Sequence, residues 1–237
     1  MSGCRYFSKE TSVPVKTGPV PIDDPAIVRS IVQASPDYRT HQDELVRRIV
    51  LSECLLRGHW QLQSGAHSDV FLRFRSFVRD WDNAVWAASR LAETFRRLAW
   101  HPTAIVAPET AGSLLALALN DAEFAERDRV FLVKADSTNH PLDYFLTDAV
   151  GPRESVLIVN DIVTTGRGIQ QLVDVSRERG AEPIGVVVFA SRDADADLGG
   201  LRSSWIADVK AEQWDPTVCP ICEKEGTTDL FYAKEFN

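Results

Sequence analysis

Apolar and polar residues follow two different periods along most of the chain. Short, continuous apolar runs predict buried strands at residues 104–106, 130–133, 156–159, 183–190 and 204–209. Between these runs apolar residues recur at helical spacing, which predicts helices over 111–120 and 168–179. Continuous apolar strands that alternate with helices are typical of a parallel sheet covered on both faces. The pattern therefore predicts an α/β fold.

The part of the chain before residue 100 carries a different pattern. Apolar residues recur at helical spacing up to a stop at Gly58, and they are Leu45, Ile49, Val50, Cys54 and Leu55. Residues 60–62 and 70–74 alternate like strands around a turn at Gly65. Residues 82–98 predict an amphipathic helix whose apolar face is Val85, Ala88, Leu91, Ala92 and Phe95.

The first 40 residues contain prolines at five positions and show no sustained period: Pro14, Pro19, Pro21, Pro25 and Pro36. We expect an irregular N-terminal arm over 1–40, with a short helix at 25–33, followed by one domain over 41–237. Two interpretations of the arm are open. It is either a loosely held leader or a strap across a partner subunit. In the second case the partner could also be a different protein.

Composition limits the classes of function. The chain has 237 residues, 44% of them hydrophobic and 25% charged, with a net charge of -8. An acidic chain does not neutralise a nucleic-acid backbone, although backbone amides can still hold a small anion. No apolar run approaches the ~20 residues that span a bilayer, and the start resembles no signal peptide. With four cysteines and no disulfide framework, we expect a cytoplasmic protein without membrane or nucleic-acid partners.

The most informative segment is residues 156–168, in which a buried strand ends at Asn160 and Asp161 and enters a Thr-Thr-Gly turn before a helix. A carboxylate at the carboxyl end of a parallel strand lies where ligands bind, and it can accept hydrogen bonds from the vicinal hydroxyls of a ribose. Thr164, Thr165 and Gly166 supply hydroxyls and accessible amides, and the helix N-terminus favours a dianion. These features predict a site for a ribose phosphate.

An ordinary strand-to-helix turn is the alternative for this segment. In it, Asp161 and Thr164 would merely cap the helix. Capping explains one such residue, but not a polar pair followed by Thr-Thr-Gly-Arg-Gly.

Residues 156–168 resemble the phosphoribosyl-diphosphate motif of the type I phosphoribosyltransferases: an apolar strand, two acidic residues, two apolar residues and Thr-Thr-Gly. The resemblance implies a Rossmann-like parallel sheet flanked by helices, with a small hood. It also implies that the donor's ribose and 5-phosphate are bound by Asn160, Asp161, Ile162, Val163, Thr164, Thr165, Gly166, Arg167 and Gly168. The chain departs from the motif at Asn160, which lacks the charge that would stabilise a cationic ribosyl transition state.

Two further segments are similar to the orotate branch of this family. Residues 56–72 resemble its N-terminal hood, and Cys219-Pro220-Ile221-Cys222 resembles the Cys-Pro-Leu-Cys tail of some bacterial members. The resemblance covers about residues 41–225, which makes the fold expectation independent of any single motif. It places the hood at about 56–75 together with the C-terminal region.

The resemblance also assigns residues around the donor and the base. The pyrophosphate-binding residues it implies are Glu109, Thr110, Ala111, Gly112 and Lys134. The base-binding residues it implies are Gln63, Ser64, Gly65 and Arg192. Lys134 has an alternative as a surface lysine, and Arg192 has one as a salt-bridge partner of Asp193 or Asp195.

Three departures from the family pattern remove positive or negative charge. Gln63 stands where the family has Lys or Arg, Asn160 replaces an acid, and residues 135–143 contain His140 but no Lys or Arg in place of a basic catalytic loop. Donor binding can survive these changes, whereas rapid turnover depends on charge.

The resemblance implies an enzyme that transfers 5-phosphoribosyl from 5-phosphoribosyl diphosphate, bound with Mg²⁺, to a pyrimidine base and releases pyrophosphate. Orotate is the first expectation, with Asp161, Asn160 and Lys134 as catalytic residues and a homodimer as the assembly. Two alternatives are open. One is a transferase for another base in a specialised pathway, and the other is a weakened donor- or nucleotide-sensing module that acts with a partner protein.

The cysteines Cys219 and Cys222 have the spacing of half a zinc site, but no second pair follows them, and Cys4 and Cys54 are remote in sequence. The sequence therefore favours no protein-bound metal beyond the Mg²⁺ carried by the donor. A zinc site, a structural knuckle and a redox-sensitive pair are left open for these two residues.

Overall fold

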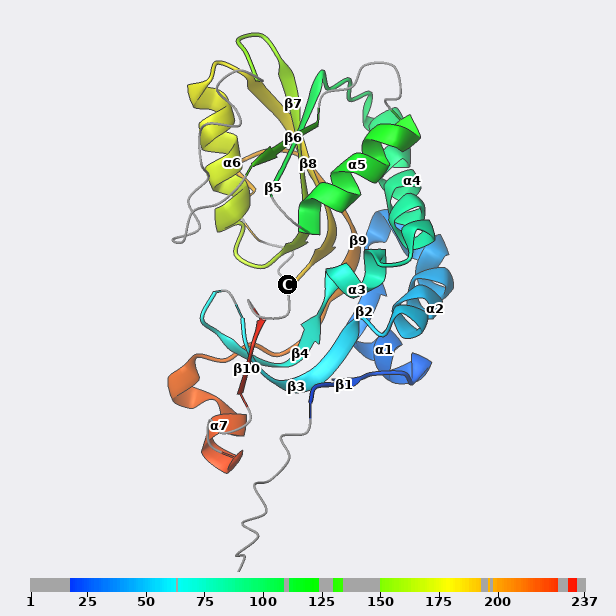
Figure 1. The fold of residues 1–237 in the computed structure, drawn as a ribbon, viewed down its shortest axis with the longest axis vertical. Helices are drawn as coiled ribbons and strands as arrows, with labels where there is room; N and C mark the ends of the chain where they lie inside the picture. The colour runs from blue at the N-terminus through cyan, green and yellow to red at the C-terminus, as the bar shows by residue number, and fades with distance from the viewer. Residues whose placement is uncertain are drawn as a thin grey trace, which may run out of the picture.

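The computed structural model describes residues 18–62, 64–108, 111–123, 130–133, 150–192, 196, 198–225 and 230–233. Within them the chain forms a main sheet covered by helices and a second, smaller sheet, which we call the hood (Figure 1). No helix in this part of the chain combines the length and the apolar composition that crossing a membrane requires.

The main sheet follows the order β2 (Val32–Ala34), β9 (Ser203–Val209), β8 (Glu182–Ser191), β7 (Ser155–Val163), β5 (Ala104–Pro108) and β6 (Val130–Val133). All neighbouring strands from β9 to β6 are parallel, and β2 pairs antiparallel with β9 at one edge. The predicted α/β fold with a parallel sheet is confirmed.

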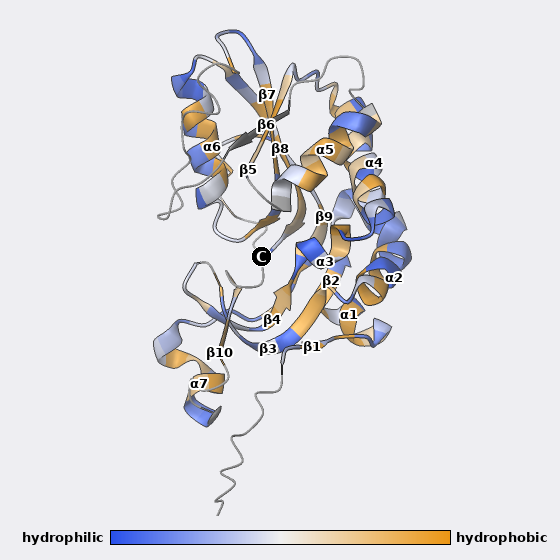
Figure 2. Cartoon of the chain, viewed as in Figure 1, coloured by the Kyte–Doolittle hydropathy of each residue, from blue (hydrophilic) through white to orange (hydrophobic). Residues whose placement is uncertain are grey.

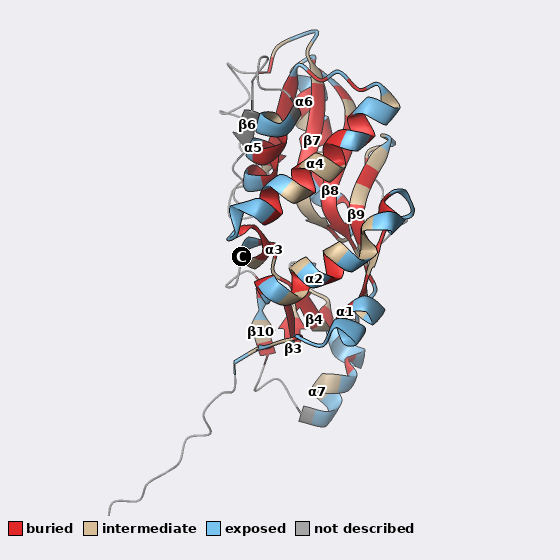
Figure 3. Cartoon of the chain, turned by 90° about the vertical axis from the view of Figure 1, so that its right-hand side faces the viewer, coloured by how far each residue is buried: buried red, intermediate tan, exposed pale blue. Residues whose placement is uncertain are grey.

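Helices cover both faces of the main sheet (Figures 1 and 3). One face carries α1 (Pro25–Ile31), α2 (Gln42–Ser52), α3 (Phe74–Val78), α4 (Trp81–Leu98) and α5 (Ala111–Glu123). The other face carries α6 (Arg167–Glu178). On the predicted apolar face of α4 one residue is misplaced, because Val85 is 37% exposed.

Successive residues of β7 enter different cores, which explains why the strand is apolar without a break. Leu157 and Val159 belong to the core beneath α4 and α5, whereas Ile158 packs with Leu172 of α6. A strand buried on both faces has no polar side to alternate with. The central strands accordingly stand out as hydrophobic in Figure 2.

The hood contains β1 (Val20–Pro21), β3 (Leu55–Gln61), β4 (His67–Leu72) and β10 (Leu230–Tyr232). Strand β3 is central: it pairs antiparallel with β4, from Leu55 opposite Leu72 to Gln61 opposite His67, and parallel with β10. The segment before β10 holds the 3-10 turn η3 (Pro216–Val218) and helix α7 (Pro220–Glu225). A small aromatic core of Trp60, Phe71 and Phe231 holds the hood together.

The N-terminal region differs from the predicted irregular arm. Residues 1–17 lie outside the described part. Residues 18–40 form β1, α1, β2 and most of the 3-10 turn η1, which runs over Pro36–His41. Val28 and Val32 are fully buried, and the hydroxyl of Tyr38 lies in hydrogen-bond contact with Thr94 and Ser204. The short helix predicted at 25–33 is confirmed as α1, whereas β1, β2 and η1 are too short to show a period and were not predicted. Residues 18–40 pack on the chain's own sheet, and the choice between a leader and a strap stays a prediction.

Two boundaries before residue 80 also differ from the predictions. Helix α2 ends at Ser52, because Glu53 takes a left-handed conformation with φ of 51°, and Leu55 already belongs to β3. Gly58 lies inside β3, where a side chain would meet the ring of Phe231, and does not stop a helix. Phe74 begins helix α3 and is not the end of a strand.

Candidate functional site

The turn between β7 and α6 has an uncapped helix N-terminus. Strand β7 ends at Val163, residues 164–166 form a bend, and α6 begins at Arg167. Gly166 occupies the N-cap position with φ of 76°, a left-handed conformation that glycine adopts without steric cost, and no side chain caps the helix. The alternative in which Asp161 or Thr164 caps this helix is therefore wrong. The first amides of a helix lack partners within it, so this bend suits an anion.

Asn160 and Asp161 lie half-buried on the last part of β7. The amide N–H of Asp161 donates to Asn160 Oδ1 at 2.8 Å, which orients the Asn160 side chain. Burial raises the pKa of Asp161 to about 6, although backbone N–H groups oppose this shift. A carboxylate held away from water gains from new hydrogen-bond donors or a cation, which is what the hydroxyls of a ribose or a donor-bound metal supply.

The first turn of α5 lies beside the same end of β7. Strands β5 and β7 are parallel neighbours, with Val106 opposite Ile158. A side chain at Gly112, in the first turn of α5, would lie 3.2 Å from Asn160 Oδ1 and 3.1 Å from Pro108 Cδ. Glycine therefore lets the start of α5 approach Asn160 closely. The structure thus brings Gly112, of the predicted pyrophosphate-binding group, next to Asn160, of the predicted ribose-binding pair.

Several predicted pyrophosphate-binding residues lie outside the described part of the chain. These are Glu109, Thr110 and Lys134, together with the loop 135–143 that contains His140. Ala111 is the first residue of α5, and Gly112 follows it. The assignment of the whole group stays a prediction.

Arg192 connects the main sheet to the hood. Its backbone N–H donates to Val163 O at 2.9 Å, which places it next to the end of β7. Its guanidinium donates from Nη2 to Val70 O at 2.7 Å and from Nη1 to Ser68 Oγ at 3.4 Å. Burial lowers the pKa of Arg192 to about 10, and the nearby carboxylate of Asp69 opposes the shift. The alternative partners Asp193 and Asp195 lie outside the described residues.

The predicted base-binding turn connects β3 and β4 of the hood. Leu62 N–H donates to Ala66 O at 2.8 Å, and Gly65 N–H donates to Leu62 O at 2.9 Å, which closes a tight hairpin. Gly65 has φ of 88°, and Ser64 is exposed beside it. Gln63 lies outside the described residues. Ser64 and Gly65 therefore lie at the tip of the hood hairpin, whose strand β4 is bonded to Arg192.

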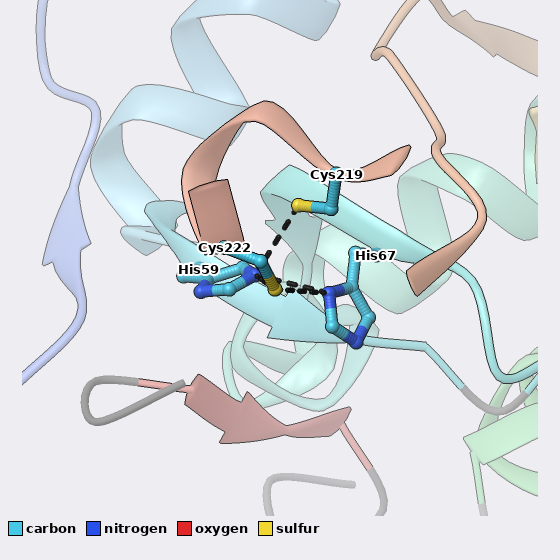
Figure 4. A group of neighbouring side chains, drawn as sticks. All are labelled: His59, His67, Cys219 and Cys222. Atoms are coloured by element: carbon cyan, nitrogen blue, oxygen red, sulfur yellow. Dashed lines mark hydrogen bonds between the residues drawn. The ribbon is translucent and has the colours of Figure 1, made fainter. Parts of the chain in front are cut away.

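The two cysteines of the tail lie against residues that the sequence analysis did not connect with them. Cys219 and Cys222 meet His59 of β3 and His67 of β4 (Figure 4). One signal for this was present, because the hood segment places these histidines on either side of the hairpin turn. Only the packing of the tail on the hood shows that they face the cysteines.

Comparisons with known proteins bear on the family and the fold. No protein-family model matches the chain. A solved orotate phosphoribosyltransferase from Aeropyrum pernix shares the fold, with a TM-score of 0.54 and 22% identity over 67% of this chain and 90% of that one. The fold is that of the type I phosphoribosyltransferases.

Sequence relatives define the class further. The orotate phosphoribosyltransferase of Erythrobacter litoralis is 30% identical over 159 residues, which cover 66% of this chain and 80% of the relative. That of Desulforamulus reducens is 24% identical over 184 residues, which cover 78% of this chain and 93% of the relative. The chain belongs to the orotate phosphoribosyltransferase branch of the type I phosphoribosyltransferase family, whose members are pentosyltransferases.

Proposed function

We propose that this enzyme transfers the 5-phosphoribosyl group from 5-phosphoribosyl diphosphate to orotate and releases pyrophosphate. One observation carries the proposal: the uncapped bend at Gly166 adjoins a half-buried carboxylate, Asp161, at the carboxyl end of β7. An anion site beside a group that accepts from hydroxyls matches the two ends of a ribose 5-phosphate. The names of the sequence relatives support orotate as the acceptor.

In this proposal different residues bind the different parts of the donor. Residues 164–168 hold the 5-phosphate with amides and hydroxyls, while Asn160 and Asp161 accept from the ribose hydroxyls. The turn before Gly112, together with Lys134, receives the pyrophosphate. Displacement at the anomeric carbon develops positive charge on the ribose, so an ionised Asp161 stabilises the transition state electrostatically. The remaining task of the chain is to hold donor and base in line.

The family implies that Mg²⁺ accompanies the donor, and the side chains at this site are compatible with it. Mg²⁺ prefers oxygen ligands, keeps several waters and needs one or two carboxylates when phosphates supply the rest. Asp161 offers a carboxylate whose pKa is raised by burial, and a cation beside it would favour its ionised form. When bound, Mg²⁺ neutralises charge on the diphosphate. Asp161 and the Asn160 amide oxygen are the groups of β7 that would face it.

The base lies, in this proposal, between the hood hairpin and the end of the main sheet. Ser64 and Gly65 offer the hairpin tip, with Gln63 between Leu62 and Ser64 in sequence, and Arg192 offers a guanidinium held in place by Val70 O. A planar guanidinium suits the carboxylate of orotate. We further propose a homodimer in the cytoplasm, and light scattering at several protein concentrations tests the dimer.

Turnover with a panel of bases tests the proposed reaction. The full chain is incubated with 5-phosphoribosyl diphosphate, Mg²⁺ and, in turn, orotate, uracil, adenine or hypoxanthine, while pyrophosphate and nucleotide are measured. We expect both products with orotate alone. The Asp161→Asn variant should lose them, whereas the control Asp174→Asn, which changes an exposed carboxylate of α6 bonded to Gln170, should keep them.

Two other results would replace the proposal by its alternatives. Products with a different base would indicate a transferase of a specialised pathway. Calorimetric binding of the donor without product from any base would indicate a sensing module.

A further inference from the structure

Four side chains from two distant parts of the sequence point their ligand atoms at one another on the hood (Figure 4). They are His59, His67, Cys219 and Cys222, and their nitrogen and sulfur atoms all lie within 4.8 Å of one another. The two histidines and Cys219 are buried, at 5%, 3% and 2% exposed, and Cys222 is half-buried. We call this group the His–Cys cluster.

The strand register puts the two histidines on one face of the hood. Gln61 pairs directly with His67 across the hairpin, and His59 lies two residues before Gln61. Alternate residues of a strand share a face, so His59 and His67 are diagonal neighbours on it. This face is covered by the tail of the chain.

Backbone pairing fixes the tail beside both histidines. Trp214 and His67 exchange two hydrogen bonds, of 2.8 and 2.9 Å, in an isolated antiparallel bridge. The Asp215 side chain then caps η3, which leads directly into Cys219. Beyond α7 the chain returns as β10, where Leu230 pairs with His59. The cysteines therefore lie on a segment that is held at both ends.

Hydrogen bonding does not account for how closely these atoms approach. Nε2 of His59 lies 3.1 Å from Nδ1 of His67 and 3.5 Å from the sulfur of each cysteine. A ring nitrogen carries either one proton or one lone pair, so it cannot satisfy three such neighbours at once. A cation at the centre accepts one lone pair from each of the four atoms.

Four of the six separations in the cluster are those of a tetrahedral zinc centre. Zn–N bonds of about 2.0–2.1 Å and Zn–S bonds of about 2.3 Å at tetrahedral angles put two nitrogens about 3.3 Å apart and nitrogen and sulfur about 3.6 Å apart. The cluster shows 3.1 Å between its nitrogens, and 3.5, 3.5 and 3.3 Å between nitrogen and sulfur. Two thiolates and two imidazoles are also a donor set that selects zinc.

We propose that the His–Cys cluster binds one Zn²⁺ as a structural centre that fastens the C-terminal tail to the hood. Four protein ligands fill a tetrahedral ion and leave no position for substrate, so the site is structural and not catalytic. Binding releases the thiol protons of Cys219 and Cys222 to solvent, since the metal takes thiolates. The centre lies at one end of the hairpin whose tip holds Ser64 and Gly65, so it stiffens that hairpin.

Metal content and competition measurements test the site on the full chain. Protein purified under reducing conditions should contain about one zinc per chain, measured by mass spectrometry of the metal. The Cys222→Ala variant should bind zinc at least ~10-fold more weakly in competition with a chromophoric chelator. The matched control is Cys54→Ala, which removes a buried cysteine of the main core and should keep the metal.

A second measurement does not depend on how well the variants fold. The metal-free full chain is titrated with Co²⁺, which should give the visible bands of a tetrahedral ion together with thiolate charge transfer. A chain that takes up neither metal would overturn the proposal, as would a metal-free protein with a Cys219–Cys222 disulfide. Equal loss of zinc in the Cys54→Ala and Cys222→Ala variants, both of them folded, would overturn it as well. None of these results depends on whether the enzyme accepts orotate.

Discussion

The β7–α6 turn and the His–Cys cluster are built in opposite ways. The turn draws its groups from consecutive residues, Asn160 to Gly168, and much of its binding capacity comes from backbone amides placed by one strand and one helix. The cluster draws on side chains as far apart as His59 and Cys222, which are 163 positions apart in sequence. Local structure creates the first site, and tertiary packing creates the second.

Because of this difference, a mutation in one site should have a different consequence from a mutation in the other. The turn sits on a main sheet buried on both faces, so a change of one functional side chain there should alter ligand binding with little effect on the fold. In the described part of the chain a small aromatic core holds the hood together, so loss of the metal from the cluster should loosen the hood. The two sites should therefore fail independently.

The largest difference between the effects on the two sites is expected for the Asp161→Asn variant. The amide cannot supply negative charge to the ribose in the transition state, so kcat with orotate should fall by about 100-fold. Zinc content and the cobalt spectrum should stay as in the unaltered chain. Steady-state kinetics beside metal analysis checks both, and a parallel loss of zinc would show that the two regions are not independent.

The pH dependence of stability examines the same carboxyl in the absence of ligand. Burial raises the folded pKa of Asp161 to about 6, above its ordinary value of 3.8. Between these values the unfolded chain binds fewer protons than the folded chain, so stability is lost as pH rises through this window and the cost is complete above it. Relative to the unaltered chain, Asp161→Asn should gain about 2 kcal/mol of unfolding free energy in going from pH ~4 to pH ~7.5. Urea unfolding at the two pH values measures this, and a gain equal at both would contradict the burial of the charge.

Removal of the metal should affect the base more than the donor. Chelation loosens the hairpin that carries Ser64 and Gly65, whereas the β7–α6 turn keeps its structure. We expect KM for orotate to rise about 10-fold and KM for the donor to change less than about twofold. Kinetics with and without chelator, followed by zinc addition, distinguish this from general inactivation. Equal rises in both KM values would remove the proposed link between the cluster and the base.

The smallest expected change is an increase in kcat for the Asn160→Asp variant. Asn160→Asp restores the acid of the family motif and adds charge next to the developing ribosyl cation, so kcat should rise about threefold. The added charge also raises the pKa of Asp161 further, so the gain should appear at about pH 8 and vanish at lower pH. A pH–rate profile of both forms checks it, with Asp174→Asn as the control that should leave kcat unchanged.

The same contrast explains how far the sequence predicted the structure. Strands β5, β7 and β8 were predicted because burial on both faces leaves an unbroken apolar run. Of the short elements between residues 18 and 40 only the helix α1 was predicted; β1, β2 and η1 were not, since each buries only one or two residues such as Tyr38.

Within the sites, features formed by consecutive residues were predicted from the sequence, and contacts between distant residues were not. The bend at Gly166 could be predicted from its own residues, although the sequence left open whether a side chain caps the helix. The close approach of Gly112 to Asn160, the bond from Arg192 to Val70 O and the meeting of His59 and His67 with the cysteines depend on strand order and register. No local pattern encodes these contacts.

A crystal structure of the full chain with 5-phosphoribosyl diphosphate and Mg²⁺ tests the central claim most directly. We expect the 5-phosphate to lie against the amides of residues 164–168 and the ribose hydroxyls to bind Asp161. A donor bound elsewhere, or a β7–α6 turn closed around its own side chains with no phosphate in it, would contradict it.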